Sequence, residues 1–232
     1  MNNYIIWNNR DSRDINGLLI SELPPITKPK MRVNETAIDG VDGSIIEELG
    51  YESYDKTVVI GLKIGTDPDK ITDFFTGNGK VVFSNEPDKY YIARIIKSID
   101  YERALRYRKA KVTFRVQPFK YERVEVARQA TSSQKNMSIE NIGNHTSKPL
   151  ITIEGSGRIE LLWGDQMVCN YTFPDGETSV VLDSETQDAY WGSVLKNRHM
   201  NGEFPIFEKG INMLSWTGDV ERIKVERYSR WL

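Results

Sequence analysis

The chain has 232 residues, of which 39% are hydrophobic and 28% are charged, and its formal net charge is −2. This length and composition suit one large or two ordinary globular domains and exclude wholesale disorder. No apolar run approaches the ~20 residues that a membrane-spanning helix needs, and the N-terminus lacks a signal-peptide pattern, so we expect no membrane insertion.

The cysteine and histidine counts restrict the possible chemistry. The single cysteine, Cys169, cannot form an intrachain disulfide, and together with His145 and His199 it supplies too few ligands for a structural zinc site. Neither a GxSxG elbow nor a papain-like cysteine context is present. We therefore predict no catalytic residues, no cofactor, no metal site and no enzymatic activity. A glycosidase-type carboxylate pair stays open, because the chain has 33 acidic residues.

Four runs of alternating apolar residues predict strands in the first half of the chain. They cover residues 56–64 (KTVVIGLKI), 80–84 (KVVFS), 90–97 (YYIARIIK) and 111–116 (KVTFRV). The turn-rich residues 85–88 between the second and third runs predict a hairpin. Pro118 is expected to end the fourth strand.

One helix start stands out between the first two of these runs. Asp67 can cap the helix, and Pro68 fits its first position. Gly77 then stops the chain. We expect this short amphipathic helix to lie on a sheet through its apolar residues Ile71, Phe74 and Phe75.

The composition changes after Tyr121, where residues 127–138 (ARQATSSQKNMS) are small and polar. We place a boundary there and predict two domains, residues 1–128 and residues 138–232. Strands are predicted at 150–154, 158–163, 178–182, 211–216 and 220–228, and turns at 155–157, 164–165, 174–176 and 217–219. The fold class is therefore mainly β: an N-terminal β-rich domain with one short helix, followed by an antiparallel β-sandwich.

Basic residues are concentrated in one window. Residues 101–128 hold nine Lys or Arg and three Glu, a local charge of +6 in a chain of net charge −2. This surface could face nucleic acid, an acidic surface of a neighbouring subunit, or solvent and acidic loops of its own domain. The candidate channel or interface residues are Arg103, Arg106, Arg108, Lys109 and Lys111.

Four of the five tryptophans lie in the second half of the chain. Exposed aromatic side chains there could stack on sugar rings, and the candidates are Trp163 and Trp191. Packing in the core of a sandwich is the ordinary alternative for a tryptophan within a strand.

The order of short segments along the chain carries a family resemblance. In the first half these are residues 6–14 (IWNNRDSRD), 38–43 (IDGVDG), 50–51 (GY), the capped helix, 82–92 (VFSNEPDKYYI) and 118–121 (PFKY). In the second half they are residues 141–143, 148–151 (KPLI), 181–183 with Glu185, and 202–212 (GEFPIFEKGIN). In this order they resemble the distal tail proteins (Dit family) of long-tailed bacteriophages that infect Gram-positive bacteria, over nearly the entire chain.

The resemblance implies a structural role in the virion. The N-terminal domain would form a homo-hexameric ring, a hub at the tail tip that joins the tail tube protein to tail-associated lysin or fibre proteins of the baseplate. Its lumen would lie on the route of the tape measure protein and DNA, and the second domain would be galectin-like. The protein would be made and assembled in the bacterial host cytoplasm.

A ring also needs surfaces that neighbouring subunits can cover. The hairpin within residues 80–97 is the candidate, through Val82, Phe83, Tyr90, Tyr91 and Ile92. The alternative function is a module that binds saccharides of the host cell wall through the C-terminal sandwich.

Overall fold

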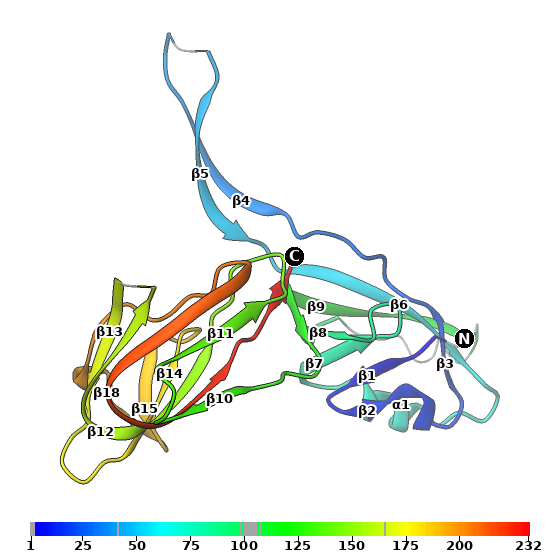
Figure 1. The fold of residues 1–232 in the computed structure, drawn as a ribbon. Coiled ribbons are helices and arrows are strands. Elements are labelled where there is room, and N and C mark those ends of the chain that lie inside the picture. Colours follow the sequence, from blue (N-terminus) through cyan, green and yellow to red (C-terminus); the bar gives the residue numbers. More distant parts are fainter. Residues whose placement is uncertain (1–2, 41, 98, 100–105, 107, 165) are drawn as a thin grey trace. The chain divides into compact units, whose positions relative to one another are not determined.

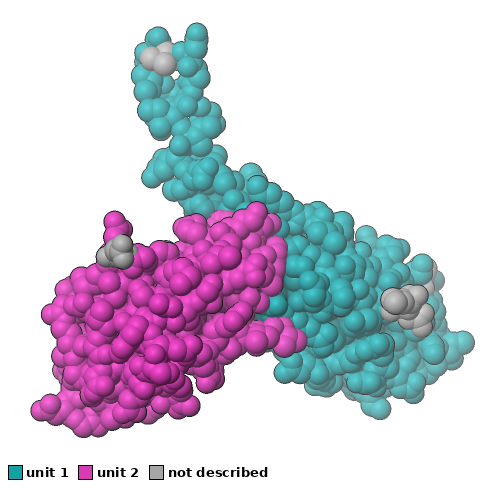
Figure 2. Space-filling view, in the orientation of Figure 1, with its two compact units in different colours: residues 1–123, 232 teal, residues 124–231 magenta. Residues whose placement is uncertain are grey.

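A computed structural model describes residues 3–40, 42–97, 99, 106, 108–164 and 166–232. The chain divides into two compact units, unit 1 (residues 1–123 with Leu232) and unit 2 (residues 124–231), as Figures 1 and 2 show. Strands dominate both units, so the predicted mainly β class is confirmed. In the described part of the chain, no helix has the length and hydropathy needed to cross a membrane.

Unit 1 is built on one curled antiparallel sheet with the strand order β2-β1-β7-β8-β9-β6-β3. Its strands are β1 (Ile5–Trp7), β2 (Arg10–Asp11), β3 (Leu18–Glu22), β6 (Tyr54–Leu62), β7 (Asn78–Phe83), β8 (Lys89–Ile95) and β9 (Lys109–Glu122). A separate two-stranded sheet consists of β4 (Met31–Ala37) and β5 (Ser44–Tyr51). The short 3₁₀ helix η1 (Ser12–Asp14) follows β2, and helix α1 (Pro68–Phe74) follows β6.

Helix α1 forms as its local sequence predicts. The Asp67 side chain accepts a hydrogen bond from the Asp69 backbone N–H, and Pro68 occupies the first turn. Ile71 and Phe74 are completely buried in the core of unit 1. That core also holds Trp7, whose ring centroid lies 5.3 Å from that of Phe114 in an edge-to-face contact.

The four strands predicted in unit 1 are confirmed, and so is the β7–β8 hairpin. The prediction that Pro118 ends its strand is wrong, because β9 continues to Glu122. The register between β8 and β9 shifts between Tyr91 and Ala93, where Pro118 lies on the opposite strand. A proline has no N–H to donate, and a β-bulge is a position where none is needed.

Unit 2 is one antiparallel sheet that curls around its own apolar core. Its strands are β10 (Arg128–Thr131), β11 (Asn136–Asn141), β12 (Leu150–Trp163), β13 (Gln166–Thr172), β14 (Ser179–Asp183), β15 (Asp188–Trp191), β16 (Val194–Leu195), β17 (Met200–Gly202) and β18 (Gly210–Glu226), and the 3₁₀ helix η2 spans Asn197–His199. The short strand β19 (Arg230–Trp231) is not part of this sheet. The long strands β12 and β18 pair along most of their length. The turn predicted around Pro174 and Gly176 is confirmed.

Two of the turns predicted in this unit are wrong. Residues 155–157 lie within β12 and residues 217–219 lie within β18, so that four predicted strands are in fact two. A Cβ atom on Gly155 would lie 2.2 Å from the Asp219 carbonyl oxygen, and one on Gly218 would lie 2.4 Å from the Arg158 carbonyl oxygen. These glycines therefore allow two long strands to approach closely where their register shifts.

A buried polar cluster holds the β7–β8 turn against the sheet of unit 1. Glu86 in this turn is 8% exposed and accepts hydrogen bonds from the Lys120 ammonium and, at 2.7 Å, from the Tyr91 hydroxyl. Lys56 on β6 is 2% exposed, and its ammonium donates to the Pro25 carbonyl oxygen at 2.8 Å. Burial lowers the pKa of Lys56 to about 8, although the Glu86 carboxylate opposes this shift.

The lowered pKa of Lys56 predicts a stability that rises with pH. Above pH 8 the folded chain releases a proton from Lys56 that the unfolded chain keeps until its ordinary pKa of 10.5. The unfolded state then binds more protons, so unit 1 should gain roughly 2 kcal/mol of unfolding free energy between pH 7.5 and 9.5.

Urea unfolding, monitored through the hydrogen exchange of unit 1 peptides, measures this gain in unfolding free energy. The variant Lys56→Met should be more stable than wild type at pH 7.5 and should lose the rise. If the unfolding free energy rises equally with pH in both proteins, titrating groups other than Lys56 cause the rise.

Candidate subunit interface

The hairpin formed by β4 and β5 is the most exposed part of unit 1. It forms its own two-stranded sheet, which Figure 1 shows as a free-standing ribbon, and every described residue from 32 to 50 is exposed. At its base the Glu52 N–H donates to the Lys30 carbonyl oxygen at 2.8 Å, and the Tyr51 ring lies 5.9 Å from that of Phe119. An isolated two-stranded hairpin is marginally stable in water, so contact with another surface would stabilise this one.

Carboxylates and apolar side chains cover this hairpin, which we call the acidic hairpin (residues 31–51). Five Asp or Glu residues and one Arg give it a charge of −4. Its exposed large apolar residues are Val33, Ile38, Ile45, Ile46 and Leu49, with exposed fractions between 46% and 60%. The Arg32 guanidinium donates to the Leu49 carbonyl oxygen at 2.9 Å and so joins the two strands.

The face of the main sheet opposite the core carries the reverse charge. On β9, Val112, Phe114 and Val116 are buried in the core, whereas Lys109, Lys111 and Arg115, which point to the other face, are exposed. The same alternation exposes Arg94 on β8 and Lys80 on β7. We call this surface the cationic face, and it consists of Lys80, Arg94, Lys97, Lys109, Lys111 and Arg115.

Two like charges stand directly opposite each other on the cationic face. Arg94 on β8 pairs in register with Arg115 on β9, an arrangement that destabilises a sheet unless an anion offsets it. Asp55 on β6 partly does so, with oxygens 2.6 Å from the Lys97 ammonium and 3.2 Å from the Arg115 guanidinium. These two cations hold the pKa of Asp55 below its ordinary value. Among the described residues, no carboxylate pairs with Arg94, Lys109 or Lys111.

The predicted basic cluster is only partly described. Lys109 and Lys111 are exposed and lie on the cationic face, whereas Arg103 lies outside the described residues. Arg106 and Arg108 are exposed, and the Arg108 backbone has a φ of 57° while its carbonyl oxygen accepts the Leu62 N–H at 3.0 Å. Arg94 and Arg115 were not among the candidates, because their pairing depends on a strand register that the sequence does not display.

The β7–β8 hairpin residues proposed for an interface lie mostly inside unit 1. Val82, Phe83, Tyr90 and Tyr91 are each at most 8% exposed, and Ile92 is 42% exposed. Tyr90 stacks on Tyr121 with 5.5 Å between ring centroids. Of these five residues, Ile92 therefore offers the surface for a neighbour, and it lies on the same side of β8 as Arg94.

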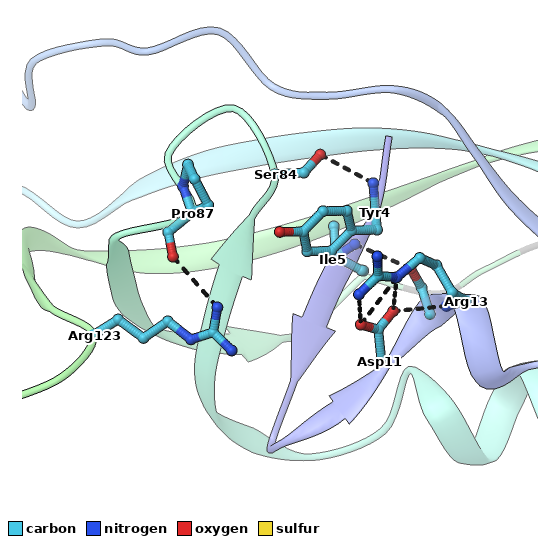
Figure 3. A network of polar contacts seen from close by, with 8 residues as sticks. Tyr4, Ile5, Asp11, Arg13, Ser84, Pro87 and Arg123 are labelled. Carbon is cyan, nitrogen blue, oxygen red and sulfur yellow. Dashed lines mark hydrogen bonds and ion pairs between the residues drawn. The ribbon is translucent and has the colours of Figure 1, made fainter. Parts of the chain in front are cut away.

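A polar network ties the first strand of unit 1 to the β7–β8 turn (Figure 3). The Tyr4 N–H donates to the Ser84 hydroxyl at 3.0 Å, and the Arg13 guanidinium lies 4.2 Å from the Tyr4 ring centroid. Arg13 also donates to both carboxylate oxygens of Asp11, which holds the pKa of Asp11 below its ordinary value. Arg123, from the basic window, donates to the Pro87 carbonyl oxygen at 3.4 Å. This network is structural, since it fixes β1 against its neighbours.

The two candidate saccharide-stacking residues differ in environment. Trp163 is partly buried and stacks on Phe207 of the unit 2 core, with 5.0 Å between ring centroids. Trp191 is 50% exposed and pairs across strands with Val194, which is 55% exposed. The structure therefore places Trp163 against the core and leaves Trp191 as the tryptophan available for stacking.

Comparison with known proteins finds solved structures of similar fold. No protein-family model and no curated protein matches the sequence. The crystal structure of the Dit protein of phage SPP1, described as a paradigm of the hub adsorption apparatus in phages that infect Gram-positive bacteria, matches with a TM-score of 0.71 at 17% identity. The match covers 97% of this chain and 99% of that one. The chain shares the fold of SPP1 Dit.

A second structure supports this assignment of the fold. A chain of the phage P2 baseplate, in its activated conformation with calcium, matches with a TM-score of 0.54 at 9% identity, and all of both chains is covered. The fold that the sequence resemblance implied is therefore confirmed over both units. The galectin-like character of unit 2 stays a prediction.

Proposed function

We propose that this chain is a structural subunit of the hub at the distal end of a bacteriophage tail. Its N-terminal domain, residues 1–128, forms a homo-hexameric ring at the tail tip. The ring joins the tail tube protein to tail-associated lysin or fibre proteins, and the tape measure protein and DNA pass through its lumen. The C-terminal domain, residues 138–232, is a sandwich attached to this ring. The protein acts by assembly and has no catalytic role.

The observation that carries this proposal is the acidic hairpin. All described residues among the 19 positions from 32 to 50 are exposed, and five of them are large and apolar. In a monomer, these apolar side chains stay in water and contribute no burial to stability. A subunit that is covered by neighbours gains both burial and strand order from the same segment. The likeness of the whole fold to the SPP1 hub protein supports the same role.

Multi-angle light scattering of the purified full-length chain tests the proposal. We expect a concentration-dependent species with six times the mass of the 26.7 kDa chain. Because such rings can depend on a tail neighbour, the measurement is repeated with the adjoining tail tube protein added. A monomer under both conditions, up to millimolar concentration, would contradict the proposed function.

A further inference from the structure

We propose that the acidic hairpin of one copy docks on the cationic face of unit 1 in the next copy. This inference rests on the proposed function, which requires self-assembly but does not say which surfaces meet. The occupant of the cationic face is then a segment of a second copy of this chain.

Charge complementarity is the first reason. The acidic hairpin carries −4, and the strand register places Glu35 of β4 and Glu48 of β5 on the same face of it. The cationic face carries six exposed Lys or Arg side chains around Asp55. Its opposed pair Arg94 and Arg115 costs stability in the free subunit, and a neighbour's carboxylates would offset that cost.

Exposed apolar side chains on both surfaces are the second reason. On the cationic face Ile92 is 42% exposed, and Leu19 on the edge strand β3 is 48% exposed. On the hairpin face that holds Glu35 and Glu48, Ile46 is 60% exposed and Val33 is 46% exposed. A charged interface gains affinity mainly from the apolar contacts within it, and here both partners supply them. A nucleic acid would satisfy the cations but would leave the side chains of Ile92 and Leu19 without an apolar partner.

Topology gives the third reason. The hairpin and the cationic face are different surfaces of one chain, so their contact is head-to-tail and leaves a second hairpin and a second face available for further copies. Such a contact continues until it closes by rotation into a ring or extends as a filament. It therefore produces the kind of assembly that the proposed function needs.

Charge reversal on each surface tests the docking in the full-length chain. The first variant carries Glu35→Lys and Glu48→Lys, which lie on one face of the hairpin, and the second carries Lys109→Glu and Lys111→Glu on the cationic face. All four positions are exposed, so both variants should fold as wild type does. We expect each variant alone to need about 100-fold higher concentration for half-assembly, because the hairpin charge changes from −4 to 0 in the first variant and the six cations of the face are reduced to a net +2 in the second, which removes most of the attraction between the two surfaces.

Restoring complementarity should restore assembly. In a 1:1 mixture of the two variants, the introduced lysines of one hairpin can pair with the introduced glutamates of the other variant's face, and the unchanged hairpin meets an unchanged face at the next contact. Alternating copies can therefore close any ring with an even number of subunits. The chain that carries all four substitutions should also assemble by itself. As a matched control, Lys135→Glu with Lys209→Glu reverses two exposed lysines of unit 2 and should leave assembly unchanged.

Each outcome is decisive. Rescue in the mixture and in the fourfold variant supports the docking, whereas reversed variants that assemble at wild-type concentration overturn it. Loss of assembly without rescue also overturns it. If Lys109→Glu with Lys111→Glu leaves assembly intact but abolishes binding of a short DNA duplex, the cationic face serves nucleic acid instead. A wild-type chain that never assembles contradicts the proposed function itself, which separates that failure from a wrong choice of surfaces.

Discussion

Replacing Glu86 by alanine should lower the free energy of unfolding of unit 1 by about 3–5 kcal/mol. The carboxylate is 8% exposed and accepts hydrogen bonds from the Lys120 ammonium and the Tyr91 hydroxyl. Its removal leaves a buried cation and a buried hydroxyl without their partner, beside the buried Lys56. An unpaired buried charge is among the costliest defects in a folded protein, so we expect Glu86→Ala to destabilise unit 1 more than substitution of any exposed charged residue of this unit.

Hydrogen exchange of unit 1 peptides during urea unfolding measures the effect of Glu86→Ala. Glu86→Gln keeps the acceptor geometry and loses the charge, so its cost should be smaller. Glu48→Ala removes an exposed carboxylate and should change stability by less than about 0.5 kcal/mol. A loss below about 1 kcal/mol for Glu86→Ala would show that water reaches the cluster and that its burial is incomplete.

Removing the acidic hairpin should abolish assembly and leave unit 1 folded. Met31 and Tyr51 pair directly across β4 and β5, so an Asn-Gly turn can connect them in place of residues 32–50. Every described residue that is removed is exposed and lies outside the core cluster of unit 1. The shortened chain should therefore keep its unfolding midpoint within a few degrees and remain monomeric where wild type assembles.

Light scattering and thermal unfolding of the same sample separate the two properties. As a control, Ala37 and Ser44, which pair near the tip, can be joined by an Asn-Gly turn in place of residues 38–43. This change keeps both strands of the hairpin and should preserve assembly. Full assembly of the chain without residues 32–50 would show that the hairpin is not part of the subunit contact.

The sequence predicts the elements whose signals are local or that bury one face. Helix α1 follows from Asp67, Pro68 and its apolar spacing, and β6 follows from the alternation of Val58 and Ile60. In each case the pattern visible in the sequence is the pattern that packs in the core. This is why the positions of β6, β7 and β8 were predicted to within two residues.

The acidic hairpin escaped prediction for a physical reason. Alternation of apolar and polar residues indicates a strand with one buried face. Neither face of the sheet formed by β4 and β5 is buried, so the apolar and acidic residues of these strands follow no period of two. The available signals were its charge of −4 and the glycines at 40, 43 and 50. Long-range geometry was equally invisible, since Gly155 and Gly218 have turn-like sequences but serve a close approach of β12 and β18.

In the candidate interface too, some residues could be predicted from the sequence and others depend on long-range geometry. The exposed Lys109 and Lys111 could be found from charge density alone, whereas the pairing of Arg94 with Arg115 depends on a register that shifts beside Ile92. The aromatic residues chosen on β7 and β8 are apolar enough for an interface, but the core of unit 1 and the stack with Tyr121 already use them.

Electron microscopy of the purified full-length chain, with and without the adjoining tail tube protein, tests most directly whether this polypeptide is a ring-forming hub subunit. We expect annular particles whose class averages have six-fold symmetry and a central channel. Single compact particles under both conditions, or open filaments without closed rings, would contradict it.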